Sequence, residues 1–237
     1  MSEARRVSTA VMGLAERVAE VQRQVAAAAA ASDRDPAEIT IIAVCKTAPR
    51  ESVDAAIDLG LRHFAENRVQ DALRKFEAPL PAGCDLHLIG HLQTNKARPA
   101  VGLFDVIETV DRPSLISALE KEAARLEKRL PVLIQVNIAG EEQKAGCAPQ
   151  EAHGLLAALT ASSWLEPQGF MTMAPLVADP EEVRPVFRGL RELRDRLQEQ
   201  FADVPLPILS MGMSNDYPIA IAEGATLVRV GRAIFGS

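Results

Sequence analysis

The chain has 237 residues, of which 48% are hydrophobic and 24% are charged, and its formal net charge is −6. These values are ordinary for a globular protein, and the length suits either two small domains or one α/β barrel of about 250 residues. The negative charge disfavours a nucleic-acid-binding surface, and no apolar run of about 18 residues predicts a membrane span.

The amino-terminal segment 1–32 is predicted to form a long helix that ends in the alanine run 26–31. Its first residues lead into an amphipathic pattern and not into the apolar core of a signal peptide. The three cysteines, Cys45, Cys84 and Cys147, have neither disulfide nor metal spacing, which indicates a reducing compartment. We therefore expect a cytoplasmic protein whose first helix packs on the rest of the chain.

After this helix, short apolar runs alternate with helical stretches to the end of the chain. Apolar runs separated by helices are typical of a parallel sheet that is covered on both sides. Eight runs favour a closed (β/α)8 TIM barrel over an open sheet, and no linker or internal repeat divides residues 1–237, so we expect one domain. The predicted strands are 40–45, 62–65, 85–89, 105–110, 131–138, 167–172, 206–210 and 226–230. The predicted helices include 50–59, 67–77, 113–129, 149–161, 181–201 and 217–223.

Polar residues follow several of the predicted strands. Lys46 ends the first of them in the segment IIAVCKT, where a buried amine is costly unless it is paired or used chemically. Asn67 follows the second strand and Arg229 lies near the end of the eighth. Because the site of such a barrel is built at the carboxyl ends of its strands, we expect these side chains to line one mouth.

The last two strand ends predict a phosphate site. In this fold the loops after strands seven and eight commonly bind phosphate through backbone N–H groups. The segment SMGMSND supplies Ser210, Gly212 and Ser214, with Ser214 as a helix N-cap, and VGRAIFG supplies Gly231. Plain turn and cap residues are the alternative interpretation, but the lysine at another strand end favours phosphate.

A lysine amine beside a phosphate site suits two common chemistries. One is a Schiff base with a phosphorylated sugar, as in class I aldolases, and the other is a Schiff base with pyridoxal 5′-phosphate. Arg229 favours the second, because a guanidinium group can only donate a hydrogen bond and would keep a pyridine nitrogen unprotonated.

Six ordered segments resemble the pyridoxal phosphate homeostasis (YggS-like) family: IIAVCKT, FAENRVQDAL, HLIGHLQTNKA, VLIQVNIAGEEQKAG, GFMTMAP and the run from LSMGMSNDYP to VRVGRAIFG. The resemblance implies a fold type III barrel, similar to the amino-terminal domain of alanine racemase. It also implies cofactor-binding roles for particular residues: Lys46 for the Schiff base, Asn67 near the ring, Arg229 at the pyridine nitrogen, and Ser210, Gly212, Ser214, Gly231 and Arg232 for the phosphate. Two residues depart from the usual family pattern, Cys45 before the lysine and Arg232 where threonine is frequent.

The resemblance implies a carrier that buffers pyridoxal phosphate and delivers it to apo-enzymes, with no catalytic residues of its own. The alternative is a fold type III enzyme such as an amino-acid racemase, which needs acid–base groups on both faces of the substrate. In alanine racemase the second group is a tyrosine of a carboxyl-terminal domain, whereas here the chain ends six residues after Gly231 and the only tyrosine, Tyr217, lies in the phosphate loop. We therefore expect a non-catalytic protein. We also expect it to be a monomer.

Three other features receive structural interpretations. His87 and His91 are four residues apart, but Gly90 interrupts any helix between them, so we expect no metal site. Strand alternation predicts that Cys45 points away from Lys46 as a buried, inert thiol. Lys144, in the charged loop EEQKAG, is a second-choice amine for transient binding of the cofactor.

Overall fold

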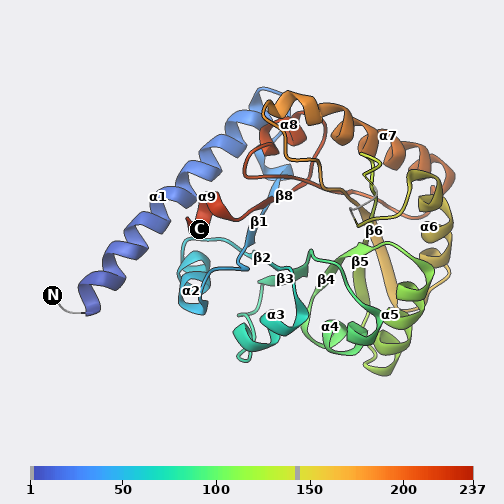
Figure 1. The fold of residues 1–237 in the computed structure, drawn as a ribbon, viewed down its shortest axis with the longest axis horizontal. Helices are drawn as coiled ribbons and strands as arrows, with labels where there is room; N and C mark the ends of the chain where they lie inside the picture. Colours follow the sequence, from blue (N-terminus) through green and yellow to red (C-terminus); the bar gives the residue numbers. More distant parts are fainter. Residues whose placement is uncertain (1–2, 142–144, 237) are drawn as a thin grey trace.

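Eight parallel strands close into a barrel in chain order, with β1 paired to β2 on one side and to β8 on the other (Figure 1). This computed structural model describes residues 3–141 and 145–236, and for residues 3–12 the backbone alone; Lys144 lies outside the described residues. The prediction of a (β/α)8 TIM barrel is confirmed. The strands are β1 Thr40–Val44, β2 His63–Glu66, β3 Asp85–Leu88, β4 Val106–Val110, β5 Leu130–Gln135, β6 Leu165–Met171, β7 Ile208–Met213 and β8 Leu227–Val230.

The seventh strand differs most from its prediction, 206–210. It begins at Ile208, after a proline that has no N–H for the ladder, and it continues to Met213. The register of β7 against β8 shifts between Ser210 and Met213, where Gly212 adopts a φ of +89°. Glycine and serine usually indicate a turn, but here the glycine accommodates an irregularity inside the strand. Ser210 therefore lies in the middle of β7 and not at its end.

Helices surround the barrel (Figure 1). They are α1 Glu3–Ala30, α2 Arg50–Asp58, α3 Val69–Lys75, α4 Ala97–Leu103, α5 Pro113–Arg125, α6 Ala152–Thr160, α7 Arg184–Gln200, α8 Tyr217–Ala222 and α9 Arg232–Phe235. Single 3-10 turns precede β1, α4, α6 and α7; they are η1 Pro36–Glu38, η2 Thr94–Lys96, η3 Pro149–Glu151 and η4 Pro180–Val183. In the part of the chain that is described, no helix is both long enough and apolar enough to cross a membrane.

Helix α1 lies along the outside of the barrel, where it contacts α8, α9 and α2. Its buried residues recur at the spacing of one helix face: Leu14, Val18, Val21, Val25 and Ala29. This apolar stripe explains why the helix packs on the barrel.

The interior of the barrel is mixed in polarity. Strand alternation turns Ile42, Ala65, Leu133, Met171 and Leu227 into one apolar cluster, separate from the larger core between strands and helices. Several polar side chains on these strands are also buried, and buried polar groups need hydrogen-bond partners. They include His87, Glu108, Gln135, Ser210 and Arg229.

Candidate functional site

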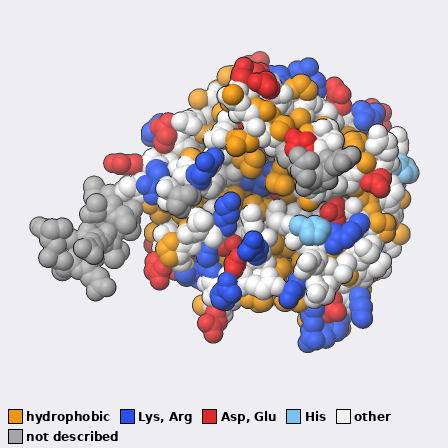
Figure 2. All heavy atoms as spheres, viewed as in Figure 1, with side chains coloured by type: hydrophobic (Ala, Val, Ile, Leu, Met, Phe, Trp, Pro, Cys, Tyr) orange, Lys and Arg blue, Asp and Glu red, His pale blue; other side chains and the backbone are white. Residues whose placement is uncertain are grey.

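A cavity of about 500 Å³ opens at the carboxyl ends of the strands. Figure 2 shows a hollow near the middle of the displayed face, bordered by hydrophobic side chains and by Lys and Arg side chains. Six of the eight predicted binding residues line the cavity: Lys46, Asn67, Ser214, Arg229, Gly231 and Arg232. Its apolar wall includes Val44, Ile89, Met173 and Met213. The structure therefore brings together residues that are up to 186 positions apart, from Lys46 to Arg232.

Lys46 follows the end of β1 and its side chain is exposed to the cavity. Within the described residues, no hydrogen bond or ion pair engages its amine. The preceding residue, Cys45, is fully buried, and its thiol donates to the carbonyl of Ala65 at 3.3 Å. Burial raises the pKa of the Cys45 thiol to about 12, so this cysteine is unreactive, as its place on the opposite face of the strand predicts.

A second lysine stabilises the end of β1 from the outside of the barrel. Lys75, on α3, donates to the backbone carbonyl of Cys45 and to Oε1 of Glu66, the latter at 2.5 Å. Glu66 is almost completely buried and needs this cation. Lys75 is therefore occupied in an ion pair and does not line the cavity, whereas Lys46 does.

Asn67 carries an unsatisfied polar atom in the wall of the cavity. Its Oδ1 is buried and has no hydrogen-bond partner among the described residues. The chain approaches the backbone of Asn67 closely at Gly90, where an added Cβ would lie 2.0 Å from the main-chain carbonyl oxygen of Asn67. Buried polar groups normally have partners, so an orphaned amide oxygen here fits a hydrogen-bond donor of a bound ligand.

Arg229 belongs to a hydrogen-bonded chain inside the barrel. Its two terminal nitrogens donate to Oγ of Ser210 at 2.7 Å and to the carbonyl of Thr172 at 2.8 Å. Ser210 in turn donates to Oε2 of Glu108 at 2.5 Å, and the other oxygen of Glu108 lies 2.7 Å from Nδ1 of His87. Burial acts to raise the pKa of Glu108, but His87, Arg229 and Ser210 together hold it below its ordinary value.

Two predicted phosphate-binding residues are not among those that line the cavity. Ser210 points into the barrel, where Glu108 and Arg229 engage its hydroxyl. Gly212 serves the packing of β7 on α8, because an added Cβ would lie 2.6 Å from Cβ of Ala220. Both differences follow from the longer β7, which carries these residues below the rim.

The rim itself offers backbone N–H groups from two loops. Those of Ser214 and Asn215 have no hydrogen bond within the described residues, and those of Arg232 and Ala233 open the first turn of α9. The prediction of Ser214 as a helix N-cap is wrong, because α8 begins only at Tyr217, and Asp216 is the residue that precedes it.

The charges in the cavity wall favour an anion. Its described lining contains three cations, Lys46, Arg229 and Arg232, and one carboxylate, Asp216. Asp216 accepts from the N–H of Met213 at 2.6 Å, and burial raises its pKa. A phosphate ester at the rim would meet the free N–H groups, the Ser214 hydroxyl and a surplus of positive charge.

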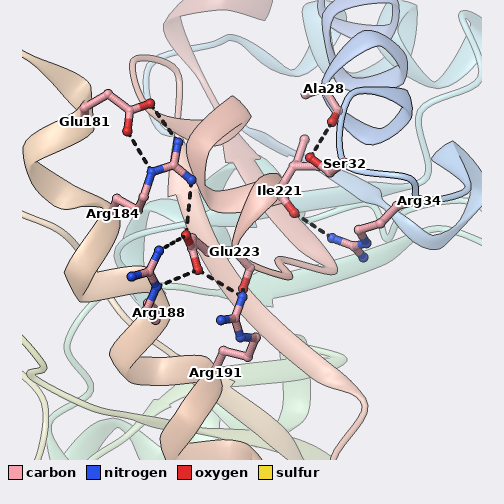
Figure 3. A network of polar contacts seen from close by, with 9 residues as sticks. All are labelled: Ala28, Ser32, Arg34, Glu181, Arg184, Arg188, Arg191, Ile221 and Glu223. Atoms are coloured by element: carbon pink, nitrogen blue, oxygen red, sulfur yellow. Dashed lines mark hydrogen bonds and ion pairs between the residues drawn. The ribbon is translucent and has the colours of Figure 1, made fainter.

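Helix α8, which follows the first of these loops, is anchored from outside (Figure 3). Glu223, directly after α8, accepts from Arg184, Arg188 and Arg191 of α7 at 2.9–3.1 Å. Arg34 donates to the carbonyls of Ile221 and Ala225 at 2.9 and 2.8 Å. These contacts fix the carboxyl-terminal end of α8 on the barrel and thereby help to position the loop that precedes this helix.

We expect Glu223→Gln to destabilise the protein by about 1–3 kcal/mol, because a buried acceptor of several charge-assisted hydrogen bonds becomes neutral. Burial opposes ionisation, but the hydrogen bonds from Arg188 and Arg184 lower the pKa of Glu223. Its stabilisation is thus complete above the ordinary glutamate pKa and is lost as the pH falls through the lower folded value. Urea unfolding at several pH values measures both effects. Glu181→Gln, which removes an exposed partner of Arg184, is the control and should change stability little.

The sequence interpretation missed Glu108 and Asp216. A glutamate inside the apolar run 105–110 was a signal for Glu108, because strand alternation assigns every second residue to the barrel interior. Tyr217, expected in the phosphate loop, is buried and its hydroxyl bonds to Gln24 of α1. His91 does not approach His87; it is exposed, with Nδ1 3.7 Å from Asp111.

Known proteins match this chain over nearly its whole length. The sequence profile of the family described as "Alanine racemase, N-terminal domain" matches residues 17–237. The pyridoxal phosphate homeostasis protein of Aquifex aeolicus is 39% identical over 95% of this chain and 98% of its own length. The protein of the same name from Pseudomonas aeruginosa is 38% identical over 94% and 95%, respectively.

A solved structure agrees with these relatives. PipY of Synechococcus elongatus PCC7942, whose structure was determined with PLP bound, is 36% identical and superposes with a TM-score of 0.83. The match covers 94% of this chain and all of PipY. The barrel described above therefore occurs in a protein of similar sequence that binds this cofactor.

Proposed function

Because the chain belongs to the pyridoxal phosphate homeostasis protein family, we propose that it binds pyridoxal 5′-phosphate in the cavity, buffers it and delivers it to apo-enzymes. The single observation that carries this proposal is the placement of Lys46, Asn67 and Arg229 around one cavity. The rim of this cavity has backbone N–H groups that can donate hydrogen bonds to an anion. The bound cofactor supplies an aldehyde, which condenses with a primary amine to a Schiff base and releases one water.

The residues of the cavity divide this task among them. Lys46 offers the amine, since its Nζ has no competing partner among the described residues. Ser214, Gly231 and Arg232, with the free N–H groups beside them, bind the phosphate at the rim. Asn67 offers its unsatisfied amide oxygen, an acceptor, beside the ring, and Arg229 faces the pyridine nitrogen as a donor.

We also propose that the protein turns over no amino acid. Arg229 would leave the pyridine nitrogen unprotonated, and such a ring withdraws electrons weakly. The single tyrosine, Tyr217, does not line the cavity, because Gln24 binds its hydroxyl at the α1–α8 contact. The names of the relatives, which describe homeostasis and not catalysis, support the same view.

Two further properties belong to the proposal. We propose that the protein works in the cytoplasm, which its three free cysteines support, since thiols persist in a reducing compartment. We also propose that it is a monomer. The large hydrophobic side chains exposed in the described residues are scattered: Leu73, Leu126 and Leu176, the last at the cavity.

A delivery experiment tests the carrier. The protein is loaded with pyridoxal 5′-phosphate, freed of excess and mixed with the apo form of a pyridoxal-phosphate-dependent aminotransferase. We expect aminotransferase activity to recover as the absorbance of the loaded protein falls, while alanine and serine are neither racemised nor decarboxylated. Pyridoxal without the phosphate, the matched ligand, should bind at least tenfold more weakly. Turnover of any amino acid at a rate on the order of 10 s⁻¹ would contradict the proposal of a non-catalytic carrier, but not the proposal that the cavity binds the cofactor.

A further inference from the structure

A cluster of potential metal ligands lies where β2 and β3 begin, at the opposite end of the barrel from the cavity. His63 is the first residue of β2, Asp85 is the first residue of β3, and the two are register partners. His87 lies two residues farther along β3, so its side chain is on the same face as that of Asp85. One ligating atom from each of the three residues lies within 4.8 Å of the others, which holds for no other group of such residues in the described chain.

Two of the three separations between these atoms are close to those in a tetrahedral metal centre. Nδ1 of His63 lies 3.2 Å from Nε2 of His87 and 3.4 Å from Oδ2 of Asp85. Nitrogen and oxygen ligands at about 2.1 Å from a tetrahedral Zn²⁺ ion are separated from one another by about 3.4 Å. The third pair of atoms, from Asp85 and His87, lies within 4.8 Å, so side-chain rotation of the exposed Asp85 would complete the spacing around an ion.

Glu108 adds the partner that metal-bound histidines usually have. Its Oε1 lies 2.7 Å from Nδ1 of His87, so it accepts the proton of that nitrogen and leaves Nε2 with a lone pair toward the cluster. Glu108 is fully buried and is held in turn by Ser210. The orientation of His87 is therefore determined before any ion binds.

The cluster is also accessible from solvent. The side chain of His63 is 32% exposed and that of Asp85 is 49% exposed, whereas that of His87 is 4% exposed. An ion can therefore approach past the first two residues, and water can complete its coordination. Two imidazoles and one carboxylate select a transition metal over Mg²⁺ or Ca²⁺, which prefer oxygen ligands alone.

We propose that His63, Asp85 and His87 bind one Zn²⁺ ion, or a similar divalent transition metal ion, with a water molecule in the fourth position. The alternative is a hydrogen-bonded cluster, in which the Nδ1 proton of His63 is shared between His87 and Asp85. This proposal differs from the expectation, from sequence, that the protein has no metal ligands. The proposal of a metal site does not rest on the cofactor cavity and stands if the proposed function fails.

Calorimetric titration with Zn²⁺ tests the site, in a Cys84→Ser background that removes the partly exposed thiol next to Asp85. We expect one equivalent per chain, an affinity at least 100-fold lower for His63→Ala, and one at least tenfold lower for Asp85→Asn. The double variant His91→Ala/His153→Ala, which removes the two histidines outside the cluster, is the matched control and should bind as the background does. Circular dichroism verifies that each variant is folded.

Co²⁺ supplies a readout of geometry. The loaded protein should show the intense visible bands of a four-coordinate ion, and His63→Ala should not. The proposal is overturned if the background protein takes up no Zn²⁺, or if the cluster variants bind like the background. It is equally overturned if the control double variant is the one that loses the ion.

Discussion

Lys46→Ala is expected to abolish the covalent attachment of pyridoxal 5′-phosphate and to change the free energy of unfolding by less than about 0.5 kcal/mol. The large functional effect follows because Lys46 is the one lysine among the described residues of the cavity wall. The small structural effect follows because its side chain is exposed and no described partner engages its amine. The phosphate donors at the rim are retained, so weak reversible binding should persist.

Borohydride reduction followed by peptide mass spectrometry measures this effect. In the unaltered protein, the reduced pyridoxyl group should be found on the peptide that contains Lys46, and the yellow absorbance should disappear on reduction. Lys75→Arg is the control, because it keeps a cation beside Glu66 and should leave the labelling of Lys46 unchanged. A pyridoxyl group found only on another lysine would contradict the assignment.

The second large effect is expected in the barrel interior, where Glu108→Leu should destabilise the protein by about 3–5 kcal/mol. Glu108 and Arg229 are both buried and are joined through the hydroxyl of Ser210. Removing the carboxylate leaves the guanidinium group in a low-dielectric interior with Asp216 as its remaining nearby anion. Arg229→Met should destabilise the protein by a similar amount, because it removes the buried cation that is joined to the Glu108 carboxylate.

A double-mutant cycle separates the interaction energy between Glu108 and Arg229 from the cost of desolvating each charge. We expect Glu108→Leu/Arg229→Met to be markedly more stable than either single variant, since two apolar side chains remove both charges of the pair together. Ser210→Ala, which removes the bridging hydroxyl and leaves both charges, should cost about 1–3 kcal/mol. Urea unfolding gives the free energies of the unaltered protein and of the four variants. Strictly additive single effects would show that the two charges do not depend on each other.

The stability that Glu108 contributes also depends on pH. Burial acts against the ionised form, but His87, Arg229 and Ser210 hold the pKa of Glu108 below its ordinary value. The stabilisation from this carboxylate is therefore complete above the ordinary glutamate pKa and is lost as the pH falls through the lower folded value. We expect the loss of stability in acid to be shallower in Glu108→Leu than in the unaltered protein.

The local pattern of the sequence determined the fold class and three of the residues that line the cavity. Apolar runs and helical stretches are short-range signals, and eight of them in alternation predict a barrel whose strand ends converge. Lys46, Asn67 and Arg229 could be found in this way, because each lies at or near the end of an apolar run. Their convergence follows from the topology alone.

The tertiary structure alone decided which way the other polar residues point. Ser210 was expected at the rim, but β7 continues to Met213 and turns its hydroxyl toward Glu108, 102 residues away. His63 and His87 meet because parallel strands pair in one register, and a shift of one strand by one residue would turn its histidine to the opposite face. Such contacts depend on register and barrel closure, which bring together positions that have no local relation in the chain.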